Sequence, residues 1–268
     1  MRSIFCAVLL ATFVISGLAQ EPKSSQLSPE ALFNRGMNAL QGTGPSRSDL
    51  KAIADVRSAA EQGFAPAQTA LGYFYENGII VTSTPAEAVR WYRKAADEGD
   101  RLGQYAAGRS YFLGSGVQMD MNEAQRWLRL AADQGYPYAQ YLLGRSLEAR
   151  DRTAAHESYR NAAEQGIPLA QYRLGLTLKD GLGVNIDKSE AYVWLLLSHE
   201  AGVEDASEPL RELEASLGSN GTDAAKTRAR ELAGSVTRSV NARGCQGWPG
   251  QLDEVPTVPP PEVQRFCR

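Results

Sequence analysis

The sequence predicts an all-α protein, an α-solenoid built from antiparallel helix pairs. The first indication is a stretch of fourteen residues that occurs four times in nearly the same form. A catalytic motif usually occurs once, whereas repetition at a fixed interval is typical of structural units that stack on copies of themselves. The copies read AAEQGFAPAQTALG from Ala59, AADEGDRLGQYAAG from Ala95, AADQGYPYAQYLLG from Ala131 and AAEQGIPLAQYRLG from Ala162.

Two sets of glycines give the repeat its length, which is the second indication. One glycine ends each AA(D/E)xG and another follows nine residues later, and in both sets the successive intervals are 36, 36 and 31 residues. A unit of this length fits two helices with their turns, and no unit shows the two-residue alternation of a strand. The short unit lacks the glycine loop of the others. The sets are Gly63, Gly99, Gly135 and Gly166, and Gly72, Gly108, Gly144 and Gly175.

Each unit is therefore expected to form a first and a second helix. One second helix is predicted over 122–134, and the first helix that follows it over 137–149. Gly135 is expected to end the second helix in the left-handed conformation, which glycine adopts without a Cβ penalty. Proline at position 137 fits the first turn of the next helix, where a missing N–H costs little.

Small residues on one helix face are the third indication. On a helical wheel the second glycine set falls on one side of the first helices together with alanine and leucine, which predicts a packing face. Glycine there lets neighbouring helices approach closely. Trp91, Trp127 and Trp194 share one position of the second helices. Because an aromatic residue recurs there at the repeat period, we expect it to belong to the core rather than to a cofactor site.

The chain divides into five parts. Residues 1–19 are typical of a cleaved secretory signal, with one positive charge, an apolar run and small residues up to Ala19. We expect export to the periplasm and no membrane span after cleavage, because the apolar run is short for a span; the alternative is an uncleaved anchor. The other parts are a linker over 20–28, the solenoid over 29–202, capping helices over 203–243 and a proline-rich tail over 244–268.

Cysteine use predicts a disulfide in the tail. Signal cleavage would remove Cys6 and leave Cys245 and Cys267, and an even pair in an exported protein favours a disulfide. Two unpaired thiols are the alternative. The tail also carries Trp248 and three consecutive prolines, which favour polyproline II; the tail either presents Trp248 to a partner or lies back on the last helices.

Composition excludes some functions. The chain has 28 Lys and Arg against 31 Asp and Glu, so no broad basic field attracts nucleic acid. No CxxC pair occurs and there are only two histidines, so a zinc site has no ligand set, and we expect no metal or cofactor.

Several short patterns of this chain, taken together, resemble the Sel1-like repeat, a relative of the tetratricopeptide repeat. They are LG, G.G, an acid, A..W and KAA..G....AQ. The resemblance covers about residues 31–202, with Asp55 and Ser158 at the tryptophan position of two units. It implies an α-solenoid that acts as an adaptor or regulator through protein contacts. Exported bacterial members of the family are associated with envelope signalling, exopolysaccharide control and host contact, which implies a protein or peptide partner in the cell envelope.

A second stripe on the same wheel is a candidate binding surface. Three positions of each first helix cluster opposite the packing face, and they hold Tyr and Arg, which are enriched at binding hot spots. The other interpretation is that the tyrosines pack between adjacent units. A purely structural spacer would instead have a polar stripe. The candidates are Tyr73, Tyr105, Arg109, Phe112, Tyr141, Arg145, Glu148, Tyr172 and Lys179.

An enzyme is the alternative class of function. Ser48 and Lys51 match Ser-x-x-Lys, a pattern of penicillin-recognising enzymes, which would make the protein a cell-wall or β-lactam hydrolase. The Lys-Thr-Gly and Ser-Asp-Asn partners are missing, and Ser48 fits better as a helix N-cap. His156 and His199 lie on different repeats without a paired nucleophile or acid. We therefore expect a non-catalytic protein.

Overall fold

The computed structural model describes residues 27–40, 47–79 and 82–243, except for the side chains of 47–49 and 237–243. The predicted signal peptide, most of the linker and the tail with Cys245 and Cys267 lie outside these residues.

Every element of the described residues is a helix, and five helix pairs follow one another, which confirms the predicted all-α solenoid. The 3-10 turn η1 (Glu204–Ala206) and the long helix α11 (Ser207–Arg243) complete the chain. The first helices of the pairs are α1 (Pro29–Leu40), α3 (Ala65–Asn77), α5 (Arg101–Leu113), α7 (Pro137–Leu147) and α9 (Pro168–Asp180). The second helices are α2 (Arg47–Glu61), α4 (Pro85–Asp97), α6 (Met121–Asp133), α8 (Arg152–Glu164) and α10 (Lys188–Glu200).

Two helix ends differ from the sequence-based expectation. Helix α7 ends at Leu147 rather than 149, because the N–H groups of Arg150 and Asp151 both donate to the Leu147 carbonyl and close a tight turn. Helix α2 already begins at Arg47, so Ser48 lies in its first turn and the predicted N-cap role of Ser48 is wrong.

The turn between units is built from glycine and a repeated glutamine. Gly135 has φ 79° and its counterparts in the other units are likewise left-handed. The side-chain amide of Gln140 then donates to the carbonyl of Ala132 at 3.3 Å, and Gln171 donates to Ala163 at 3.3 Å. The same two carbonyls also accept from the N–H groups of Gly135 and Gly166, at 2.8 and 2.9 Å, so the glutamine of the recurring AQ dipeptide adds a second hydrogen bond at the helix end.

The glycine that recurs in each first helix is explained by the short distance between the two helices of each pair. A Cβ added to Gly144 would lie 2.6 Å from the ring of Tyr159 on α8, and one added to Gly108 would lie 2.7 Å from Leu128 on α6. Gly72 and Gly175 face Tyr92 and Leu195 in the same way. Real Cβ atoms do not approach that closely, so each first helix needs glycine at this position.

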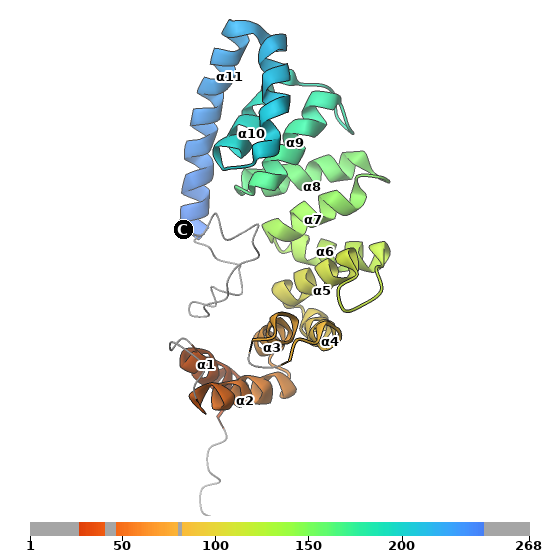
Figure 1. Ribbon diagram of the computed structural model, residues 1–268, viewed down its shortest axis with the longest axis vertical. Helices are drawn as coiled ribbons and strands as arrows, with labels where there is room; N and C mark the ends of the chain where they lie inside the picture. Colours follow the sequence, from red (N-terminus) through yellow and green to blue (C-terminus); the bar gives the residue numbers. More distant parts are fainter. Residues whose placement is uncertain (1–26, 41–46, 80–81, 244–268) are drawn as a thin grey trace, which may run out of the picture.

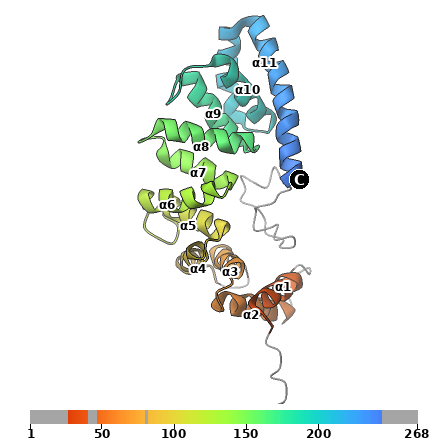
Figure 2. The same cartoon turned by 180° about the vertical axis from the view of Figure 1, so that it is seen from behind.

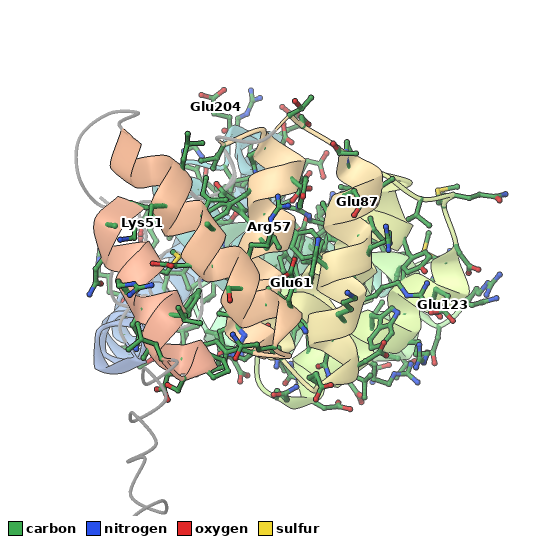
Figure 3. All side chains as sticks on the ribbon, turned by 90° about the horizontal axis from the view of Figure 1, so that it is seen from below. Lys51, Arg57, Glu61, Glu87, Glu123 and Glu204 are labelled. Carbon is green, nitrogen blue, oxygen red and sulfur yellow. The ribbon has the colours of Figure 1, made fainter. Side chains whose placement is uncertain are left out.

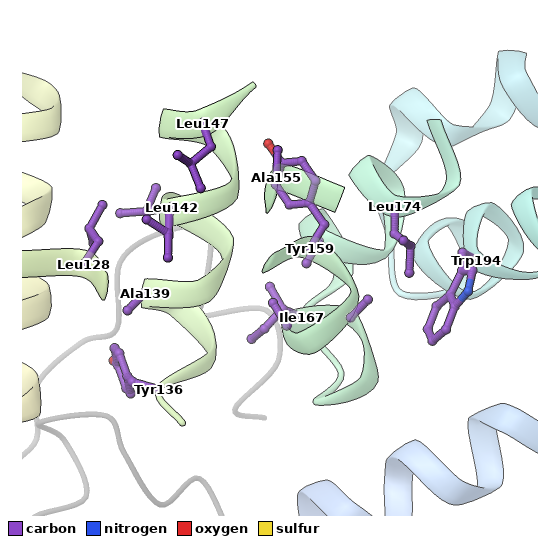
Figure 4. Close-up of a cluster of buried hydrophobic side chains, with 14 of the residues drawn as sticks. Leu128, Tyr136, Ala139, Leu142, Leu147, Ala155, Tyr159, Ile167, Leu174 and Trp194 are labelled. Carbon is purple, nitrogen blue, oxygen red and sulfur yellow. The ribbon is translucent and has the colours of Figure 1, made fainter. Parts of the chain in front are cut away.

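The core runs along the array between the helices (Figure 4). It joins buried side chains of successive pairs from α4 to α11, and a second cluster lies within α1 to α3. Trp127 and Trp194 are buried, whereas Trp91 is partly exposed, with the Lys94 amine 4.0 Å from its ring centroid. Because each pair packs on the next, no single unit carries the whole core.

The stacked pairs form a curved array whose inner side is lined by the first helices (Figures 1 and 2). Successive first helices contact each other, α3 with α5 and α5 with α7, as expected on the inner side of a curve. Seen along the long axis, Glu87 and Glu123, which occupy equivalent first turns of α4 and α6, do not superimpose, so equivalent positions of successive pairs are offset from each other (Figure 3).

Helix α11 closes the C-terminal end of the array. Its first part packs on α10, where the Tyr192 hydroxyl donates to Glu214 at 2.8 Å and the Lys188 amine to Ser216 at 2.7 Å. The chain reverses at Gly218, which has φ 69°, and the rest of α11 runs back along the concave side (Figure 1).

Candidate functional site: a pocket on the concave face

A pocket of about 200 Å³ lies between α5, α7 and the start of α9. Five of the nine residues in the predicted stripe line it, so side chains from successive units meet at this place. The lining consists of Tyr105, Arg109, Phe112, Leu113, Tyr138, Tyr141, Leu142, Arg145, Ile167, Pro168 and Leu169.

Stacked tyrosines form one wall of the pocket. The ring of Tyr105 on α5 meets Tyr136 edge-on, with centroids 5.0 Å apart, and lies 6.4 Å from Tyr138 at the start of α7. Tyr105 is only 8% exposed, so it packs between units as well as lining the pocket. Both interpretations of the tyrosine stripe therefore apply to this residue.

Tyr136 lies behind this wall and is fully enclosed. Its side chain is 1% exposed, and its hydroxyl has no hydrogen-bond partner among the described residues. Burial, followed by the neighbouring Tyr105 and Tyr138, raises the pKa of Tyr136 well above its ordinary value, so the ring stays neutral. Tyr136 consequently adds no charge behind the wall.

Arg109 is held by an ion pair across the α3–α5 junction. Its guanidinium donates to Glu76 on α3, and the other carboxylate oxygen of Glu76 accepts from the Tyr92 hydroxyl at 2.8 Å. Burial, the largest single influence, lowers the pKa of Arg109, but Glu76 together with Tyr105 and Tyr92 raises it by more, so the net shift is upward. The two charged side chains are 19% and 20% exposed, so the charge of Arg109 is neutralised within the wall.

Arg145 occupies the equivalent place at the α5–α7 junction but meets a different residue. Phe112 stands where the preceding unit has Glu76, and the Arg145 guanidinium lies 5.4 Å from the Phe112 ring centroid. Arg145 is exposed, and none of the described carboxylates lies within ion-pair distance of it. The mouth of the pocket therefore carries one cation that the described residues leave without a carboxylate partner.

The remaining residues of the stripe make contacts outside the pocket. Glu148 accepts from the Tyr159 hydroxyl and lies 3.5 Å from Arg173, whose guanidinium is 6.0 Å from the Tyr172 ring centroid. Lys179 donates to Glu212 of α11. Tyr73 is partly buried beside the Glu76 pair, and burial followed by Glu76 raises its pKa. These four predicted binding residues are thus placed at other junctions of the array.

Sequence reasoning missed part of the pocket. Tyr138, Ile167 and Leu169 belong to the turns and first residues of the first helices, beyond the helical stretch that the wheel covered. The signal was present, since the repeated turn is followed by large apolar residues in these units, YPY and IPL. Only the stacking of α7 and α9 brings them beside the stripe.

The residues considered for catalysis do not meet in this pocket. Lys51 is exposed on α2, and the side chain of Ser48 lies outside the described residues. His156 is buried between α8 and α9, where its Nδ1 lies 2.7 Å from the Thr177 hydroxyl and its Nε2 2.9 Å from Arg160. His199 is exposed and lies 3.4 Å from the Ser207 hydroxyl.

No group of His, Cys, Asp and Glu in the described part of the chain is arranged to hold a metal ion. Within the same residues, none of the helices has both the length and the apolar character needed to cross a bilayer.

Comparison with known proteins identifies the repeat. The Sel1 repeat model matches residues 29–64, 65–100, 101–136 and 168–203, which leaves out only the short unit of the array. No curated protein matches the chain closely enough to count as a relative.

Solved structures agree with this assignment. One is c5321, described as a protective antigen of uropathogenic Escherichia coli with an SLR fold; it is 28% identical, covers 82% of this chain and has a TM-score of 0.71. This chain spans about half (49%) of that protein's length. Another is a Sel1 repeat protein from Oxalobacter formigenes, 29% identical, which covers 70% of this chain and is itself covered over 86%, with a TM-score of 0.59. The resemblance found in the sequence is confirmed, and the chain belongs to the Sel1 repeat family.

Proposed function

We propose that this chain is an exported adaptor that binds an extended segment of an envelope protein in the concave pocket. Sel1 repeat proteins generally mediate protein–protein interaction, and that statement holds for the family as a whole. The finer proposal adds the site, the kind of ligand and the compartment. Binding would regulate an envelope sensor or a secretion or polysaccharide system.

The chemistry of the pocket is the observation that carries this proposal. Its volume of about 200 Å³ is below the roughly 300–1,000 Å³ of sites that enclose small molecules, so it suits one or two side chains of a longer ligand. Aromatic rings and an available arginine are the residue types that dominate protein–protein hot spots. A carboxylate of the ligand would satisfy Arg145 while an apolar side chain fills the space between the rings.

The described lining also argues against hydrolysis at this place. It contains tyrosines, arginines, proline and apolar residues, and none of the lining residues is a carboxylate, an imidazole or a thiol. A general base must lie within hydrogen-bond reach of the group it deprotonates. Recognition, rather than turnover, is what this set of side chains supports.

Export is proposed from the N-terminal sequence. One positive charge, a short apolar run and small residues before Ala19 are typical of a secretory signal. The partner would then lie in the same envelope compartment as the mature chain.

Crosslinking in the native envelope tests the proposed function. We expect Arg145→Glu to reduce the yield of crosslinked partner at least tenfold, because the substitution reverses the charge at the pocket mouth. Arg93→Glu is the matched control, since Arg93 is also exposed but lies on the second helix α4. Both variants should melt within a few degrees of the parent protein, because exposed substitutions change stability by less than about 0.5 kcal/mol. Equal capture by the two variants would refute the pocket as the binding site.

A further inference from the structure

We propose that residues 252–263 of this chain occupy the concave pocket in cis, so that the protein covers its own peptide site until a partner displaces the segment. The inference rests on the proposed function, in that the pocket must accept an extended peptide. It adds an occupant and a mode of regulation.

The segment has the composition that the pocket selects. It reads LDEVPTVPPPEV, with four prolines, three carboxylates and no basic residue. Proline-rich segments adopt polyproline II without losing much entropy, and aromatic-lined grooves recognise them in this form. Rings of Tyr105, Phe112, Tyr138 and Tyr141 line the pocket and provide such a surface.

Charge complementarity indicates which residue of the segment would lie at Arg145. The charge of Arg109 is already neutralised by Glu76, whereas Arg145 has no carboxylate partner among the described residues. Glu262 directly follows the three consecutive prolines. Prolines stacked between the rings would therefore bring the Glu262 carboxylate to Arg145, where a charge-assisted hydrogen bond is stronger than a neutral one.

The course of α11 brings the segment within reach. After Gly218 the helix runs back along the concave side for 25 residues, about 37 Å at 1.5 Å per residue, and its end lies level with α7 in both side views (Figures 1 and 2). The first proline of the segment, Pro256, lies 13 residues beyond Arg243. An extended tether of that length spans about 40 Å, the width of roughly four packed helices.

Because the segment is tethered to the solenoid, weak contacts are sufficient for it to occupy the pocket. Effective concentrations of flexibly linked groups are of the order of 1 mM, so a segment with a dissociation constant of about 100 µM as a free peptide would occupy the pocket about nine-tenths of the time. The same arithmetic predicts that a ligand added in trans binds about tenfold more weakly while the segment is in place.

The test uses a fluorescein-labelled synthetic peptide of residues 252–263 and full-length protein. It compares the parent chain with a full-length tail variant carrying Pro259→Ser, Pro260→Ser, Pro261→Ser and Glu262→Lys. We expect the tail variant to bind the peptide about tenfold more tightly than the parent chain, because its pocket is vacant. Adding Arg145→Glu to the tail variant should abolish binding, whereas adding Arg93→Glu should leave it unchanged. Circular dichroism melting of each variant verifies that the solenoid remains folded.

Three outcomes would overturn the inference. Equal affinity for parent and tail variant would mean that the pocket is not covered in cis. Absence of binding to both would mean that the pocket does not accept this segment. Concentration-dependent dimers that the tail variant abolishes, measured by sedimentation, would mean that the segment binds a second copy instead.

The envelope crosslinking experiment separates this inference from the proposed function. If the peptide binds neither chain while Arg145→Glu still loses the envelope partner, self-occupation fails and the proposed function stands. If Arg145→Glu captures the partner normally, the proposed function fails whatever the peptide does.

Discussion

Two neighbouring junctions of the array use the same positions for different purposes. At the α3–α5 junction, Arg109 pairs with Glu76, and the Tyr92 hydroxyl completes the cluster. At the α5–α7 junction, Arg145 meets Phe112 and stays exposed beside a pocket. The two arginines hold the same position in the repeat, directly after the glycine of their helices. One side-chain difference, glutamate or phenylalanine four residues after the glycine, thus determines whether the arginine joins two units or remains available to a ligand.

This difference shows how a repeat protein acquires a site. Each unit must keep the residues that let it dock, because stability in such arrays comes from nearest-neighbour interfaces. Positions on the inner surface are less constrained, so a polar contact between units can be exchanged for an open surface without changing the stack.

The largest expected effect concerns the spacing on which the comparison depends. Gly108→Val should destabilise the protein by about 3 kcal/mol, because a Cβ there would lie 2.7 Å from Leu128 and 3.0 Å from backbone of the same residue. Gly234→Val is the control, since a Cβ at Gly234 meets nothing within 4 Å. Urea unfolding of both variants measures the difference. Similar midpoints would show that the glycine does not set the helix distance.

The next effect separates the two arginines. Arg109→Ala should cost about 2 kcal/mol, because it removes the cationic partner of the mostly buried carboxylate of Glu76. Arg145→Ala should cost less than about 0.5 kcal/mol, since the side chain is exposed. Chemical denaturation gives both values. Equal losses would contradict the division between a structural and an available arginine.

The smallest effect is a pH dependence at the α8–α9 contact. Burial, and then Arg160, lowers the pKa of His156 below its ordinary 6.5, so the folded state binds this proton more weakly than the unfolded state. The free energy of unfolding is therefore highest above pH 6.5 and falls as the pH drops from there to the lowered pKa, by at most about 1.4 kcal/mol per pH unit.

Replacing the histidine tests this dependence. His156→Gln should flatten the stability profile between pH 7 and pH 5, measured as thermal midpoints in matched buffers. A profile that is unchanged by His156→Gln would assign the dependence to other groups.

Much of the fold was predictable because it rests on local, repeated signals. The helix pairs and their order were predicted from glycine turns, from proline at helix starts and from the face of small residues on the first helices. The bounds were close, and the end of α7 differed because two N–H groups share the carbonyl of Leu147. The start of α2 differed because Ser46 and Ser48 are both suitable N-cap residues, so the sequence after Gly44 and Pro45 does not single out one start.

The site was predictable only in part. The wheel brought Arg109, Phe112 and Arg145 to one side of the first helices, but angular position alone does not show which side chain of the neighbouring unit lies opposite. The pairing of Glu76 with Arg109 and the contribution of Ile167 depend on how successive pairs stack. That stacking is a property of the packed array and has no local sequence signal.

The most direct test exchanges one residue between the junctions. In Phe112→Glu, the α5–α7 junction acquires the carboxylate that Glu76 provides one unit earlier, so Arg145 should become paired and the pocket should close to acidic ligands. We expect envelope crosslinking to fall at least tenfold with the melting temperature within a few degrees of the parent protein. Undiminished capture of the partner by a folded Phe112→Glu protein would contradict the claim that the residue at this position determines whether the arginine joins two units or remains available to a ligand.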